Sequence, residues 1–152
     1  MRIRKRLVLL VLVVLAGAAG FASAQAKKPA AQEKKKAHRV FFIEPKNAAT
    51  VTSPVHMKFG AEGIEIAAVP QGDVKTTRPG IGHYHVGIDQ PCLPAGKNIV
   101  KGTPSWVHFG DGKAEFDSQL TPGKHKLALQ IGDDLHNTMR GFCSTITVNV
   151  SK

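Results

Sequence analysis

The sequence predicts an all-β domain over residues 39–152. Helical periodicity of the apolar residues is absent there, and short runs that alternate apolar and polar residues take its place. Clusters of Gly, Pro, Asn and Asp separate these runs and favour turns. About seven short strands in a little over a hundred residues are typical of an immunoglobulin-like antiparallel β-sandwich. A small closed barrel is the alternative.

Candidate strands follow one another along the whole of this region, each an alternating or short apolar run. In chain order they span residues 40–44, 55–61, 64–68, 83–89, 106–109, 114–120, 125–131 and 144–150. Turn signals lie between them at residues 45–47, 110–112, 121–123 and 132–134. Two longer segments rich in Pro and Gly, residues 69–81 and 90–105, flank the fourth strand. Loops of this length in a compact domain are often functional or cover something.

The chain begins with a pattern typical of exported proteins. Four basic residues lie among the first six, an apolar run covers residues 7–15, and small residues lead to an A-x-A ending at Ala24. This order predicts a signal peptide over residues 1–24, cleaved before Gln25, and therefore a periplasmic or secreted protein. We expect no stable membrane anchor after cleavage. An uncleaved anchor is the alternative, because the leader is just long enough to span a bilayer.

Most of the net charge of +10 lies outside the predicted sandwich. Residues 25–38 carry five Lys and one Glu among Ala, Gln and Pro. This composition cannot bury enough apolar surface to become ordered, so we expect a disordered Lys/Ala-rich linker. Residues 39–152 carry twelve basic and ten acidic residues. The high pI is therefore no indication of nucleic-acid binding, and none is expected.

The fourth predicted strand, GHYHVGID over residues 82–89, concentrates the chemistry of the chain. It alternates strictly, which is typical of a half-buried strand. Its apolar residues suit a core, while the other face carries His83, His85 and Asp89. Same-face neighbours on a strand are roughly 7 Å apart, so two imidazoles can tilt onto one ion.

Topology links this strand to a second motif, GDDLH, over residues 132–136. If the strand at His83 is the third of the sandwich and residues 125–131 the second last, the two strands pair antiparallel. The start of the first then lies beside the end of the second. We therefore expect Asp133 and His136 to approach the two histidines.

These residues predict a site for a divalent transition metal, copper or zinc, because imidazole nitrogen suits both ions and a carboxylate can complete the set. The candidate ligands are His83, His85, His136, Asp89 and Asp133, with His108 as a further candidate. His125 is not among them, because its phase puts it on the core face. It follows the corner at residues 121–123, where immunoglobulin-like sandwiches often carry a Tyr hydrogen-bonded back to the turn, and we expect His125 to replace that Tyr.

The two cysteines, Cys92 and Cys143, predict a disulfide, because an even count in an exported chain favours a bridge. Their spacing excludes a CxxC redox pair. A thiolate metal ligand is the less favoured alternative.

Four motifs carry a family resemblance: GHYHVGID, WVHFGDG, LTPGKHKLALQIGDDLH and STITVNV. Their order and spacing, over about residues 40–150, resemble the exported bacterial domain-of-unknown-function family 4399. The resemblance implies an immunoglobulin-like β fold and export, and it implies no established activity. Members of that family typically carry a third histidine between the first two, where this chain has Tyr84.

Catalytic motifs such as G-x-S-x-G, H-E-x-x-H and the P-loop are absent from the sequence, so we do not expect an enzyme. Two function classes remain. One is an exported binding module with a His-rich site for copper or zinc. The alternative is an accessory or structural module that binds an envelope protein or glycan through its loops, with histidines as ordinary hydrogen-bonding residues.

Overall fold

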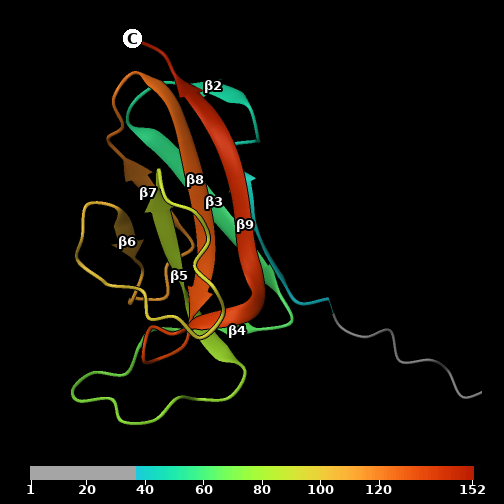
Figure 1. Cartoon of the computed structure of the whole chain (residues 1–152), viewed down its shortest axis with the longest axis vertical. Coiled ribbons are helices and arrows are strands. Elements are labelled where there is room, and N and C mark those ends of the chain that lie inside the picture. Colours follow the sequence, from blue (N-terminus) through green and yellow to red (C-terminus); the bar gives the residue numbers. More distant parts are fainter. Residues whose placement is uncertain (1–36) are drawn as a thin grey trace, which may run out of the picture. The chain divides into compact units, whose positions relative to one another are not determined.

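Nine strands and no helix make up residues 37–152, the part of the chain that the computed structural model describes (Figure 1). They are β1 (Arg39–Glu44), β2 (Ala49–Val51), β3 (Val55–Glu62), β4 (Glu65–Ile66), β5 (Ile81–Ile88), β6 (Trp106–His108), β7 (Glu115–Ser118), β8 (Gly123–Gly132) and β9 (Thr138–Val150). Within these residues no helix is long and apolar enough to cross a membrane. The predicted signal peptide and residues 25–36 of the predicted linker lie outside the described residues.

The strands form two sheets, which confirms the predicted all-β sandwich. The smaller sheet has the order β1-β3-β7, and the larger has the order β2-β9-β8-β5-β4, with β6 also paired to β5. The first order corresponds to strands A, B and E of the immunoglobulin fold, and β9-β8-β5 corresponds to G, F and C. Two short pairs, β2 with β9 and β4 with β5, are parallel, so the sandwich is not antiparallel throughout.

Side chains that alternate along facing strands fill the space between the sheets. The smaller sheet contributes Val55, Met57 and Phe59 from β3, and the larger contributes Leu127, Leu129 and Ile131 from β8. Each of these side chains gains about 1.5–3 kcal/mol from leaving water. The alternation that predicts the strands is therefore the pattern that builds the core.

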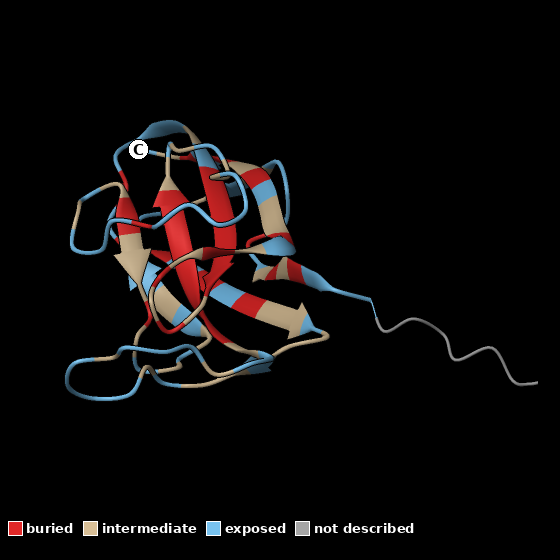
Figure 2. Cartoon of the chain, turned by 60° about the horizontal axis from the view of Figure 1, so that its bottom comes forward, coloured by how far each residue is buried: buried red, intermediate tan, exposed pale blue. Residues whose placement is uncertain are grey.

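The larger sheet is also buried on its outer face. Residues 90–105 lie over it, and Ile99, Trp106 and Ala128 form a second small core beneath them, with Cys92 and Leu93 packed against it. As a result β5 is buried over its whole length except its two end residues (Figure 2). The expectation of a half-buried strand is wrong here, because the Pro-rich loop takes the place of solvent.

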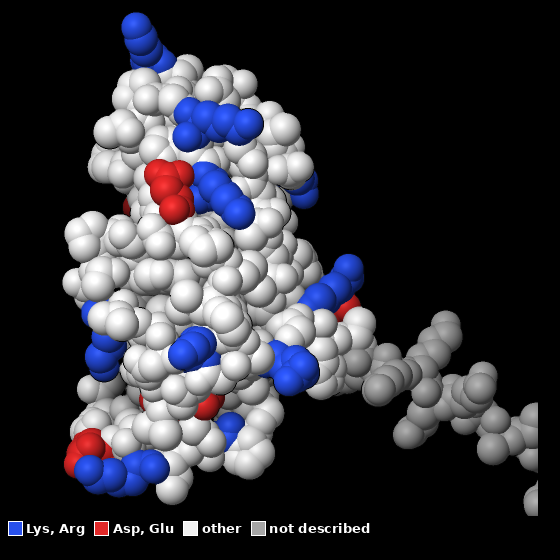
Figure 3. All heavy atoms as spheres, in the orientation of Figure 1, with Lys and Arg blue, Asp and Glu red and all other residues white. Residues whose placement is uncertain are grey.

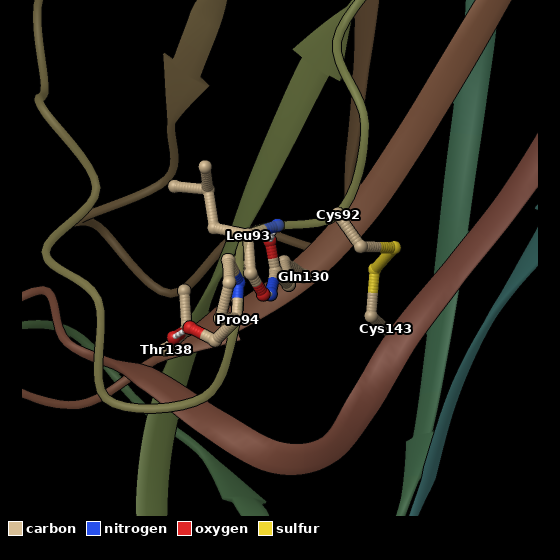
Figure 4. The surroundings of a disulfide bond; sticks show 6 residues. All are labelled: Cys92, Leu93, Pro94, Gln130, Thr138 and Cys143. Carbon is tan, nitrogen blue, oxygen red and sulfur yellow. Dashed lines mark hydrogen bonds between the residues drawn. A yellow bond between two sulfur atoms is a disulfide. The ribbon is translucent and has the colours of Figure 1, made fainter.

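A disulfide joins Cys92 to Cys143, as predicted, with 6.2 Å between their Cα atoms (Figure 4). Beside it the Gln130 amide accepts a hydrogen bond from the Leu93 N–H (3.0 Å) and donates one to the Leu93 carbonyl (2.7 Å). The Thr138 hydroxyl donates to the carbonyl of Pro94 (2.6 Å). The bridge and these polar contacts fasten the loop to β8 and β9.

Most strand boundaries differ from the predicted ones by one to three residues, and three differences are more informative. β9 begins at Thr138 rather than at residue 144, because its pairing with β8 continues past an irregularity in register to Gly132. Cys143 therefore lies inside β9. β2 is missing from the prediction, since three residues are too few to show alternation, and β4 keeps only two of five expected residues.

Charged side chains are scattered over the face shown in Figure 3, some basic ones directly beside an acidic one, with wide uncharged areas between them. Several basic residues of the domain pair with a nearby carboxylate. Arg39 and Glu62, for example, form a salt bridge across β1 and β3.

Candidate metal centre

Four histidines from three separate segments meet beside β5. His83 and His85 belong to β5, His108 ends β6, and His136 lies in the turn between β8 and β9. If one ring nitrogen is taken from each residue, the four nitrogens all lie within 4.8 Å of one another. We call these four residues the histidine cluster.

Strand register explains how β5 gathers three of them. His83 and His85 are two residues apart and share one face of β5, with ring centroids 4.5 Å apart. In the antiparallel pair with β6, His85 lies directly opposite His108. In the pair with β8, His83 lies opposite Gly132, the residue from which the chain turns toward His136.

The turn that carries His136 is held in an unusual backbone conformation. His136 has a φ of 66°, a backbone conformation that residues other than glycine rarely adopt. Its N–H donates to the carbonyl of Asp133 (2.8 Å), and its own carbonyl accepts from the N–H of Ile99 (2.8 Å). The Asp133 carboxylate accepts from the backbone N–H groups of Leu135 and Asn137, both at 2.9 Å. Asp133 therefore organises the turn.

Two glycines leave room for the rings. A Cβ at Gly132 would lie 2.7 Å from Cε1 of His85, and a Cβ at Gly110 would lie 2.3 Å from Cε1 of His108. Neither glycine has a positive φ, so close packing against the imidazoles is what requires them.

His83 and His85 are fully buried, and none of their four ring nitrogens has a hydrogen-bond partner among the described residues. Most buried polar atoms in proteins do have a partner, and each one without costs about 1–3 kcal/mol. Within the cluster the only ring-to-ring hydrogen bond joins Nε2 of His108 and Nε2 of His136, 3.0 Å apart. The two innermost imidazoles thus point unpaired nitrogens into the site.

Burial keeps these imidazoles neutral. It lowers the pKa of His83 to about 3 and that of His85 to about 2, with a smaller contribution from the neighbouring histidines. Burial is also the largest cause that lowers the pKa of His108 and His136. Neutral imidazole is the form that binds a metal, so the four side chains are ready ligands at neutral pH.

The dimensions and the donor type of the cluster fit one ion. Nitrogen ligands of zinc lie at about 2.0–2.1 Å from the metal, so two such ligands are about 3.4 Å apart in a tetrahedral site. Ligand atoms within 4.8 Å of one another reach that arrangement with side-chain shifts under about 1 Å. Imidazole donors suit both zinc and copper.

An ion pair borders the cluster. The carboxylate of Asp134 is buried and accepts three hydrogen bonds from Arg78, from Nη2 (2.7 Å), Nε (3.0 Å) and the backbone N–H (2.9 Å). These bonds hold the pKa of Asp134 below its usual range. Asp134 acts electrostatically on His83, but Arg78 already balances its charge.

The structure brings together three of the five predicted ligands, His83, His85 and His136, and adds His108, the further candidate. It does not bring in the two predicted carboxylates. Asp133 points into its own turn. Asp89 lies just past the end of β5, four residues beyond His85, and has a φ of 55°. There its carboxylate accepts hydrogen bonds from His125 Nδ1 (2.9 Å) and the Lys126 N–H (3.0 Å).

His125 has the structural position predicted for it. Its Nε2 donates to the carbonyl of Thr121 (2.9 Å), which ties β8 back to the preceding corner as the expected Tyr would. Its ring lies outside the histidine cluster.

An open cleft of about 1090 Å³ adjoins the cluster. His108 and His136 line it, whereas the fully buried His83 and His85 lie behind them. Residues 68–74, the end of β6, and Asp134–Leu135 form other parts of its wall. Sequence reasoning missed the cleft, the Arg78–Asp134 pair and the two glycines, because each depends on contacts between distant segments.

The chain matches a known family over most of the sandwich. Residues 57–151, more than half of the chain, match the family described as a domain of unknown function, DUF4399. The matched segment contains all four residues of the histidine cluster and both cysteines. No curated protein and no solved structure matches the chain. The chain therefore belongs to the DUF4399 family, as the motifs around His83 and His136 indicate.

Proposed function

We propose that the domain is an exported metal-binding module that holds one divalent copper or zinc ion on the histidine cluster. The observation that carries the proposal is the burial of His83 and His85 with all four ring nitrogens unpaired among the described residues. Coordination of a metal by one nitrogen of each ring offsets part of that cost. If the two residues had a purely structural role, nothing would offset the free-energy cost of burying their nitrogens without partners.

The donor set supports the same function. Four neutral imidazoles suit zinc and copper better than calcium or magnesium, which take oxygen ligands. The lowered pKa values keep protons from competing with the metal near neutral pH.

Export is part of the proposal and has two supports. One is the leader pattern of residues 1–24. The other is the Cys92–Cys143 bridge, since disulfides persist in oxidising compartments such as the periplasm.

An accessory module that binds an envelope protein or glycan through its loops is the second candidate. The open cleft favours it, because loops around a concave surface are common binding sites. In that function the cluster holds no ion.

Metal analysis and titration separate the two candidates. We expect elemental analysis of protein purified from its native envelope to find copper or zinc. Calorimetric titration of metal-free protein at neutral pH should show saturable binding of one ion per chain. Loss of one ligand in His85→Ala should weaken binding by about tenfold or more. His56→Ala is the matched control, since His56 is exposed, pairs with Asp117 and lies outside the cluster. Absence of saturable binding of either ion contradicts the metal-binding function and favours the accessory module.

A further inference from the structure

Lys101 stands out among the charged residues around the cleft. It lines the same cleft as His108 and His136. A lysine beside a cation site is electrostatically unfavourable unless an anion lies between the two charges.

The carboxylates of the cleft do not supply that anion, because each already has a basic partner. The pairs are Asp73 with Lys75, Asp111 with Lys113 (2.9 Å), Glu115 with Lys58 (3.4 Å) and Asp134 with Arg78 (2.7 Å). Within the described residues Lys101 forms no such ion pair. It is therefore the cation of the cleft whose charge is not balanced by a neighbouring carboxylate.

Charge balance at the histidine cluster also favours a bound anion. Four neutral imidazoles contribute no negative charge, so a divalent ion bound to them keeps its full charge in a largely buried site. Asp134 is the one buried carboxylate among the described residues, and Arg78 neutralises it. A bound ion and Lys101 together favour an anion from outside the protein.

The shape of the cleft defines how that anion enters and what it carries. Since His83 and His85 are sealed from solvent, an added ligand reaches the cluster from the side of His108 and His136. Apolar side chains also line the cleft, namely Val69, Pro70, Val74, Phe109 and Phe116. Its volume of about 1090 Å³ suits a small organic molecule rather than a simple inorganic ion.

We propose that the cleft binds a small organic carboxylate, whose anionic group contacts both Lys101 and the metal ion and whose apolar part packs against Phe109 and Phe116. This inference rests on the proposed function, because the bound ion supplies one of the two contacts.

Titration of the copper-loaded protein with benzoate tests the inference. Benzamide, which is neutral and of nearly the same shape, is the matched ligand. We expect benzoate, and not benzamide, to change the visible absorption and electron paramagnetic resonance of the bound copper in a saturable way. Lys101→Met should weaken benzoate binding by about fivefold or more, the size of an exposed charge pair. Lys97→Met is the control variant, since Lys97 lies in the same loop but does not line the cleft.

The outcomes separate this inference from the proposed function. Saturable copper binding without a response to benzoate overturns the inference and leaves the metal site in place. Equal benzoate affinity in Lys101→Met and Lys97→Met also overturns it. Failure of the unmodified protein to bind copper or zinc overturns both.

Discussion

The backbone N–H of Ile99 donates a 2.8 Å hydrogen bond to the carbonyl of His136. Ile99 is almost fully buried and lies in the loop that the Cys92–Cys143 disulfide fastens to β9. The backbone conformation of His136, a proposed metal ligand, thus depends on a loop that a disulfide holds in place.

Removal of the disulfide should therefore weaken both the fold and the metal site. We expect the Cys92→Ser/Cys143→Ser protein to lose about 2–4 kcal/mol of unfolding free energy, measured by urea denaturation. Its affinity for zinc, measured by calorimetry, should fall because His136 is held less firmly. Unchanged affinity in a folded variant contradicts the dependence on the loop.

Enlargement of Gly132 should disturb the cluster directly. In Gly132→Ala the new methyl group meets the buried ring of His85 at 2.7 Å, so the ring must shift from its place in the cluster. We expect metal affinity to fall by about tenfold or more in calorimetric titration.

Gly60→Ala is the comparison variant for that experiment, since its methyl group meets the partly exposed ring of Phe41, away from the cluster. It should bind metal like the unmodified protein. A Gly132→Ala protein that binds equally well would show that the ring of His85 is not a ligand or can move freely.

Replacement of both buried histidines should separate stability from binding. His83→Leu/His85→Leu removes four buried nitrogens that lack partners among the described residues, so the metal-free variant should be at least as stable as the unmodified protein. The unmodified protein should gain about 2.7 kcal/mol at a zinc concentration one hundred times the dissociation constant, and the variant should gain nothing. Thermal unfolding with and without zinc measures both effects. A metal-free variant that is clearly less stable would assign the two histidines a packing role.

The unmodified protein and His83→Leu/His85→Leu should also differ in how their stability depends on pH. Burial lowers the pKa of His83 and His85, so below the ordinary value of 6.5 the unfolded chain takes up protons that the folded chain does not. The stability of the metal-free protein should therefore fall as pH drops below about 6.5, by up to 1.4 kcal/mol per pH unit for each such group. In urea denaturation between pH 7 and pH 4.5, the unfolding free energy of His83→Leu/His85→Leu should fall less steeply than that of the unmodified protein. Parallel pH profiles would contradict the lowered pKa values.

The Asp89–His125 pair should give a different pH dependence. Burial lowers the pKa of His125, but hydrogen bonds to Asp89 and Thr121 outweigh it, so the net pKa is raised. Burial raises the pKa of Asp89, but the Lys126 N–H and His125 outweigh it, so the net pKa is lowered. The contribution of His125 is lost as pH rises through its folded pKa, and that of Asp89 is lost as pH falls through its own.

The pair should therefore stabilise the fold most between the ordinary pKa values, from about pH 3.8 to 6.5. We expect the difference in unfolding free energy between the unmodified protein and Asp89→Asn to be largest near pH 5 and smaller at pH 8. Metal affinity at neutral pH should be the same in both, since Asp89 lies outside the cluster. A difference in unfolding free energy that grows toward pH 8 would contradict the raised pKa of His125.

The fold and three of the four residues of the histidine cluster could be predicted because both follow from strand alternation and topology. Period-two patterning places His83 and His85 on one face, and the order of strands in a sandwich places the turn at His136 beside them. The same reasoning assigns His125 to the corner after Thr121. These inferences need only local pattern and topology.

The remaining features depend on contacts that the pattern does not encode. β6 has three residues, so nothing in its sequence shows that it pairs with β5 and sets His108 opposite His85. Asp89 continues the alternation of β5 in the sequence but lies past the end of the strand with a φ of 55°, which the alternation alone does not reveal. Lys101 reaches the cleft through an irregular loop, whose path no periodicity predicts.

The larger sheet ends in a very short strand on each side, β2 with three residues and β4 with two. An edge strand exposes a row of unpaired backbone groups, and a long one is a template for strand addition by another molecule. The two sides of the sheet differ in how much of that row stays open. β4 and β6 together cover most of the edge of β5, whereas β2 pairs only with residues 148–150 of the 13-residue β9. Crowding of many copies should therefore favour strand addition along β9 rather than along β5.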